Sequence, residues 1–126
     1  MTATVLVVDD DQDIRELVTW KLEAAGFTVH GEPDGEAGLA AALEVRPDLV
    51  LLDWMMPRLS GLEVCRALRD DPTTAQVPVI LLTAKAQEAD IQRGFAAGAD
   101  DYIVKPFSSR ELVSRVDAVL ARSAAR

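Results

Sequence analysis

The stretch Val5-Leu6-Val7-Val8-Asp9-Asp10-Asp11 decides the fold, because an unbroken apolar run there ends in three carboxylates. Three later runs have the same form: 49–52 is followed by Asp53, 79–82 by Thr83, and 102–104 by Lys105. Short apolar runs without alternation are typical of strands that are buried on both faces of a parallel sheet. Ligands bind beyond the carboxyl ends of such strands, so the polar residues that follow these runs predict one functional edge.

Helical segments separate the apolar runs along the whole chain. Strands are expected at 4–8, 28–30, 49–52, 79–82 and 101–104, and helices at 12–25, 34–45, 60–70, 86–97 and 108–122. Asp13 and Glu16 have capping-box spacing in the first helix, and Asp11 is the residue expected to cap it. This alternation predicts an α/β, flavodoxin-like (βα)5 three-layer sandwich with a five-stranded parallel sheet of order 2-1-3-4-5. That order brings Asp10 and Asp53 together.

Length and charge exclude several classes of protein. The chain has 126 residues, enough for one domain, and a net charge of −8, which argues against nucleic acid and anionic membrane as partners. No apolar stretch approaches the roughly 18 residues of a spanning helix, and the N-terminus does not resemble a signal peptide. Cys65 is the single cysteine, so an internal disulfide is excluded and a cytoplasmic location is expected.

Asp9, Asp10 and Asp53 form the expected centre of the edge. Two carboxylates ~4 Å apart repel by roughly 4 kcal/mol at an effective dielectric of about 20, so shared protons, a cation or a bound metal must neutralise them. Oxygen-only ligands that are open to water favour Mg²⁺. Lys105 adds a fixed positive charge and Thr83 a hydroxyl donor. The set matches the needs of phosphoryl transfer, with Asp53 on the central strand as the nucleophile.

Four stretches of the chain resemble the receiver domain of two-component response regulators. They are VLVVDDD (5–11), VLLDWMMPRLSG (50–61), LLTAK (81–85) and ADDYIVKPF (99–107), in the order and at the intervals of that family. The resemblance runs from about residue 3 to 121. It implies a receiver domain over 1–122 and a frayed C-terminal tail over 123–126.

The resemblance implies a Mg²⁺-dependent phosphoacceptor switch that catalyses only its own phosphorylation and dephosphorylation, and so is not an enzyme acting on other substrates. Asp53 would take a phosphoryl group from a phosphohistidine on a sensor histidine kinase or phosphotransfer protein. Asp10 would bind Mg²⁺ directly, Asp9 through water, and Met55 through its backbone carbonyl.

The resemblance also implies how the switch works. Thr83 and Lys105 would hold the phosphoryl oxygens, and movement of Thr83 would let the ring of Tyr102 swing inward. The face made by the fourth helix, fifth strand and fifth helix would then change. A cis peptide bond is expected before Pro106. Met55 and Lys85 lie at the positions that tune phosphoryl loss, and their bulk predicts slow self-dephosphorylation.

The stretch 98–116 resembles receivers of winged-helix (OmpR/PhoB-type) transcription factors, which pair through this same face. Residues for a phosphorylation-dependent homodimer are present, namely Asp100, Asp101, Glu111, Arg115 and Arg122. Ile91, Ala96 and Asp117 depart from the charges usual in that subfamily, which weakens the pairing. The chain is therefore either a stand-alone regulator or the receiver of a longer one, with no nucleic-acid binding by this domain itself.

Two other functions remain open at this stage. A Mg²⁺-dependent phosphatase or phosphotransferase could also use an aspartyl phosphate at Asp53, although Met55 stands where the haloacid-dehalogenase pattern has a second Asp. A non-phosphorylated scaffold is the third. Trp54 follows the expected phosphoacceptor and is a candidate reporter of metal binding, whereas Trp20 is expected to pack in the core.

Overall fold

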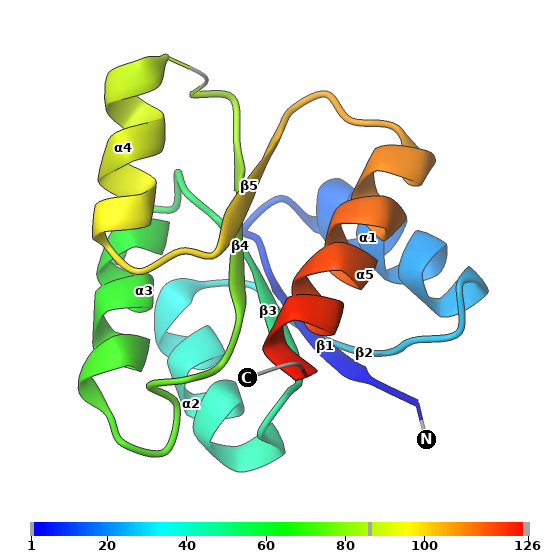
Figure 1. The fold of residues 1–126 in the computed structure, drawn as a ribbon, viewed down its shortest axis with the longest axis horizontal. Coiled ribbons are helices and arrows are strands. Elements are labelled where there is room, and N and C mark those ends of the chain that lie inside the picture. The colour runs from blue at the N-terminus through cyan, green and yellow to red at the C-terminus, as the bar shows by residue number, and fades with distance from the viewer. Residues whose placement is uncertain (1, 86, 125–126) are drawn as a thin grey trace.

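The computed structural model describes residues 2–85 and 87–124 and shows strands alternating with helices along the chain (Figure 1). In chain order the elements are β1 (Thr4–Val8), α1 (Gln12–Ala24), β2 (Thr28–Glu32), α2 (Gly35–Val45), β3 (Leu49–Asp53), α3 (Gly61–Asp70), β4 (Val79–Thr83), α4 (Glu88–Ala96), β5 (Asp101–Val104) and α5 (Ser109–Ala124).

The sheet has the predicted order, β2-β1-β3-β4-β5, and its paired strands are parallel. Most boundaries lie within one residue of the expectation, but β2 continues to Glu32 and α4 begins at Glu88, with position 86 outside the described residues. α5 continues through Ser123 and Ala124, the first half of the expected tail, while positions 125 and 126 lie outside the described residues.

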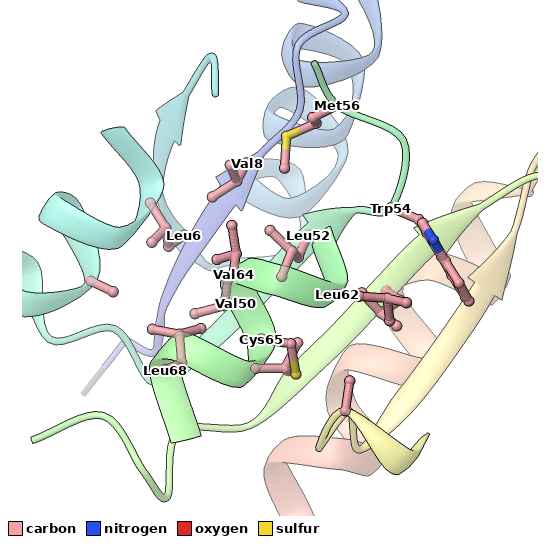
Figure 2. Packing of buried hydrophobic residues seen from close by; sticks show 14 of the residues in the cluster. Leu6, Val8, Val50, Leu52, Trp54, Met56, Leu62, Val64, Cys65 and Leu68 are labelled. Carbon is pink, nitrogen blue, oxygen red and sulfur yellow. The ribbon is translucent and has the colours of Figure 1, made fainter. Parts of the chain in front are cut away.

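Helices cover both faces of the sheet, α1 and α5 on one side and α2, α3 and α4 on the other (Figure 1). Side chains of a strand alternate between faces, so Leu6 and Val8 join one apolar cluster while Val5 and Val7 join the other. This explains why the strand sequences show no polar alternation. Figure 2 shows the cluster on the α2–α4 side, with Trp54 at its end beside Leu62.

Helix starts follow the carboxyl ends of the strands closely. The Asp11 carboxylate caps α1 by accepting from the backbone N–H of Asp13 and of Ile14, so the Asp13–Glu16 spacing does not mark the cap. Ser60 and Glu63 form a capping box at the start of α3. A Cβ on the next residue, Gly61, would lie 2.4 Å from the Asp53 carbonyl oxygen, so only glycine lets α3 begin this close to the end of β3.

Candidate functional site

Backbone hydrogen bonds continue past the strand ends and fix the positions of the expected site residues. The Asp9 N–H donates to the Glu32 carbonyl at 3.2 Å, and the Trp54 N–H to the Leu82 carbonyl at 3.0 Å. The Lys105 N–H donates to the Thr83 carbonyl at 2.8 Å. The parallel ladder therefore holds the acidic, hydroxyl and ammonium groups at one edge of the sheet.

The three predicted acidic residues converge there. Asp9, Asp10 and Asp53 each offer a carboxylate oxygen, and these oxygens lie within 4.8 Å of one another. Asp9 is fully buried and Asp53 is 4% exposed, whereas Asp10 is open to solvent. A cluster of oxygen donors with one open side fits a hard cation that keeps part of its water shell. The donor set is therefore compatible with Mg²⁺.

Asp9 is held from two directions. Its Oδ1 accepts from the Asp11 N–H at 2.9 Å, and its backbone carbonyl accepts from an Arg15 guanidinium N–H at 2.8 Å. The sequence did not predict a role for Arg15. The spacing from Asp11 places Arg15 in the first turn of α1, but no pattern in the sequence indicates that its side chain contacts the Asp9 carbonyl.

Lys105 provides the positive charge at the centre of the cluster. Its Nζ lies 3.1 Å from Asp53 Oδ1 and 3.4 Å from Asp9 Oδ2. Desolvation disfavours the ammonium, but the charges of Asp53 and Asp9 together outweigh it and raise the pKa of Lys105. The ammonium is therefore retained at the site across the neutral pH range.

Asp53 is harder to ionise than an ordinary aspartate. Burial, followed by the charge of Asp9, raises its pKa to about 6 even though Lys105 opposes the shift. The ordinary value is 3.8. Burial and the charge of Asp9 thus outweigh Lys105, so a bound cation would stabilise the ionised form of Asp53.

Thr83 is 2% exposed at the end of β4. Its Oγ1 accepts from the Lys85 N–H at 2.7 Å. The oxygen is the acceptor in this bond, so the hydroxyl proton remains available for donation to another group. That is the donor role expected for Thr83.

Tyr102 borders a small cavity of about 10 Å³ that Thr83, Phe95 and Trp54 also line. Its ring meets Phe95 edge to face, with centroids 5.9 Å apart, and the Arg115 guanidinium lies 5.9 Å from its ring centroid. Thr83 of β4 and Tyr102 of β5 therefore border the same cavity.

The loop after Asp53 presents one exposed and one buried methionine. Met55 is 61% exposed and Met56 is 7% exposed. The Lys105–Pro106 peptide bond is cis, as expected. Trp20 corrects an expectation: it is 69% exposed on α1 rather than packed in the core, whereas Trp54 is 4% exposed.

The residues expected at a dimer face make contacts within the chain. Arg115 pairs with Asp101 at 3.2 Å and with Glu111 at 3.3 Å, and Arg122 lies beside them on the same groove. Asp100 lies 3.0 Å from Arg69 and accepts from the Val79 N–H, so it joins α3 to the start of β4. The sequence did not predict Arg69 as its partner.

Comparisons with known proteins agree with this geometry. The family model for the response regulator receiver domain matches residues 5–117. The phosphate regulon transcriptional regulatory protein PhoB of Pseudomonas aeruginosa is 47% identical over 120 residues, which is 95% of this chain and 52% of that protein. The DNA-binding response regulator MtrA of Mycobacterium tuberculosis is 48% identical over 98% of this chain and 53% of that protein. The chain spans about half the length of these curated relatives.

Solved structures show the same fold. The Vibrio cholerae chemotaxis protein CheY4 superposes with a TM-score of 0.91 at 34% identity, covering 94% of this chain and 99% of that one. The BeF3-activated DrrB receiver domain gives a TM-score of 0.86 at 39% identity, covering 96% and 99%. Within the described residues, no helix is long and apolar enough to cross a membrane. The chain belongs to the response regulator receiver domain family of two-component signalling proteins.

Proposed function

We propose that this receiver domain, residues 1–122, is a Mg²⁺-dependent phosphoacceptor switch in which Asp53 takes a phosphoryl group from a phosphohistidine of a sensor histidine kinase or phosphotransfer protein. The observation that carries the proposal is the Lys105 ammonium, 3.1 Å from Asp53 Oδ1 and 3.4 Å from Asp9 Oδ2 at the carboxyl edge of the sheet. Two buried carboxylates beside one fixed ammonium are suited to bind a metal ion and to hold the oxygens of a phosphoryl group.

The transfer is a displacement at phosphorus. A carboxylate oxygen of Asp53 forms the new O–P bond while the P–N bond to the donor imidazole breaks, and the imidazole leaves with that bond's electron pair. The Thr83 hydroxyl donates a hydrogen bond to one phosphoryl oxygen, and the Lys105 ammonium pairs with another. Both groups stabilise charge where it is distributed in the transition state.

The carboxylates of Asp10 and Asp53 would hold Mg²⁺ directly, Asp9 would hold it through water, and Met55 through its backbone carbonyl. The ion would supply the positive charge that neutralises the carboxylates and the phosphoryl oxygens. The raised pKa of Asp53 supports this assignment, because burial and the charge of Asp9 disfavour its ionised form and a bound cation would stabilise that form.

The switch would operate through Thr83 and Tyr102. Phosphorylation draws the Thr83 side chain toward the phosphoryl group and enlarges the cavity that both residues border. The Tyr102 ring can then turn inward, away from Phe95, and re-shape the surface of α4, β5 and α5. We propose a cytoplasmic location, where the phosphodonor domains of such kinases act.

The output would pass through that surface to a protein partner or to a second copy of the chain. A dimer would use the predicted face, namely Asp100, Asp101, Glu111, Arg115 and Arg122. The intrachain pairs of Arg115 with Asp101 and Glu111 would then exchange for cross-chain ones. The curated relatives are about twice as long as this chain, which is compatible with a receiver attached to an output domain. A stand-alone regulator would use the same chemistry and also fits the proposal.

Acetyl phosphate tests the chemistry directly. The protein is incubated with it, with and without Mg²⁺, and intact mass is recorded beside an Asp53→Asn variant. One added phosphoryl group that requires Mg²⁺ and disappears in the variant is expected. An adduct of undiminished yield in the variant, or no adduct under any condition, would overturn the assignment.

A further inference from the structure

A groove of about 470 Å³ lies between the loop that follows Asp53 and helix α4. Its lining residues come from β3–α3, from the start of α3 and from the β4–α4 side: Trp54, Met55, Met56, Pro57, Ser60, Leu62, Lys85 and Arg93. This volume lies within the range of ordinary ligand sites. Trp54 and Lys85 also border the Thr83–Tyr102 cavity, whereas the other lining residues do not.

The floor of the groove is apolar. Trp54 is 4% exposed and Leu62 is 3% exposed, and Figure 2 shows them beside each other at the end of the core cluster. Met55 rises from the rim with 61% of its surface exposed, unlike the buried Met56. A flexible, exposed methionine beside buried apolar side chains is typical of a surface that adapts to a partner.

The charge of the groove opposes that of the protein as a whole. The chain carries a net charge of −8, yet the charged side chains lining this groove, among the described residues, are the cations Lys85 and Arg93. These two cations are the groups of the groove that an incoming anion could pair with.

Arg93 is placed to serve an incoming carboxylate. Its guanidinium lies 5.7 Å from the centroid of the Trp54 ring, which holds it over the apolar floor. Its intrachain partner, Asp90, lies 3.7 Å away, and the Arg93 side chain remains 59% exposed. The Asp90 side chain is 19% exposed, and at 3.7 Å the two groups are too far apart for a hydrogen bond, so the Arg93 guanidinium keeps N–H donors for a closer acid.

We propose that this groove is a docking surface for an acidic peptide segment of a partner protein, one that places an apolar side chain on Trp54 and Leu62 and a carboxylate against Arg93. Charge complementarity selects the acid, and the apolar floor selects its neighbour. The proposal does not depend on phosphorylation of Asp53, so each can fail without the other.

The test uses two capped pentapeptides with the same apolar residues, Ac-Glu-Leu-Glu-Phe-Glu-NH2 and Ac-Lys-Leu-Lys-Phe-Lys-NH2. A Trp20→Phe background leaves Trp54 as the single tryptophan, and neither peptide contains a fluorophore that obscures it. Each peptide is titrated while Trp54 emission and backbone amide shifts are recorded. The acidic peptide is expected to change Trp54 emission and to shift amides of the groove at concentrations at which the basic peptide does neither.

Charge-reversed variants locate the effect. Arg93→Glu is expected to weaken binding of the acidic peptide at least tenfold, and Arg93→Gln by less. Arg110→Glu changes the net charge equally but lies exposed on α5, so binding should be almost unchanged. Amide spectra of the variants verify that they remain folded. The proposal is overturned if both peptides bind alike, if the shifts map outside the groove, or if Arg110→Glu weakens binding as much as Arg93→Glu.

Discussion

The Lys105 ammonium lies 3.1 Å from Asp53 Oδ1, although 52 residues separate the two along the chain. The link exists only in the folded sheet, where β3 and β5 flank β4. It holds opposite charges together in a buried setting, yet the pKa of Asp53 still rises to about 6. Burial and the charge of Asp9 therefore outweigh the effect of Lys105 on the Asp53 carboxyl, and this balance determines how the site should respond to mutation, pH and metal.

Lys105→Met should impair phosphorylation more than folding. Removing a charged donor from the reacting oxygens is expected to slow labelling by acetyl phosphate by roughly 10²-fold. The pKa of Asp53 should rise further, because Lys105 now lowers it. Intact-mass time courses and carboxyl NMR titrations measure the two effects. Lys21→Met, which removes a lysine beside Phe107, is the control, and equal slowing in both variants would contradict the prediction.

The free energy of unfolding of the Mg²⁺-free protein should fall as pH rises from about 4 to about 6. In this window folded Asp53, with a pKa of about 6, still holds a proton that the unfolded chain, near 3.8, has lost. Because the folded state binds more protons than the unfolded chain in this window, the free energy of unfolding decreases as pH rises, by at most about 3 kcal/mol in total. Above about pH 6 this contribution is constant.

Urea denaturation in EDTA at several pH values measures this fall. Asp53→Asn removes the titrating group, so its stability should vary less over the same window. Saturating Mg²⁺ should also flatten the dependence, since it binds the ionised carboxylates. An identical pH slope in the variant would show that another group causes it.

The residues of the functional edge could be predicted from the sequence, because each of them directly follows an apolar run that forms a buried strand. Asp9, Asp53, Thr83 and Lys105 need no side-chain geometry to be assigned to one edge, only the parallel topology. The sheet order and most element bounds follow for the same reason.

Contacts between side chains of different elements could not be predicted in this way. Arg69 and Asp100 are 31 residues apart and share no periodic signal. Trp20 is a different case, because the signal was present: it lies two residues from Val18 and from Leu22, which is about 200° around a helix and so on the opposite face. Its apolar side chain favours packing, but its helical phase places it at the surface, where it is 69% exposed.

Arg69→Gln should destabilise the protein by roughly 2–4 kcal/mol. The Arg69 guanidinium donates to the carbonyl oxygens of Val77 at 2.6 Å and of Gly98 at 2.7 Å, and to Asp100 at 3.0 Å. These bonds join α3 to the segments before β4 and β5, and the variant would leave partly buried acceptors unpaired. Denaturant unfolding measures the loss.

Arg66→Gln is the matched control, since Arg66 is exposed on the same helix, and its effect should stay within about 0.5 kcal/mol. Asp100→Asn alone should destabilise, and the double variant should show a coupling energy of roughly 0.5–3 kcal/mol. Additive losses would mean that Arg69 acts through the carbonyl oxygens without Asp100.

Met55 and Lys85 should make the phosphorylated form long-lived. Hydrolysis requires water to approach the phosphorus in line, and both residues lie along the groove beside Asp53. The Lys85 backbone N–H donates to Thr83 Oγ1, and this bond holds the Lys85 backbone beside the hydroxyl that would contact the phosphoryl group. Met55, in the loop after Asp53, presents a bulky and largely exposed side chain. We expect loss of the phosphoryl group over minutes or longer, and several-fold faster loss in Met55→Ala and Lys85→Ala. Met55→Leu preserves the apolar bulk and should behave as the wild type.

The phosphorylated fraction is followed by intact mass after removal of acetyl phosphate. If label vanished within seconds from the wild type, or equally slowly from all variants, then steric exclusion of water by these two side chains would not govern the lifetime.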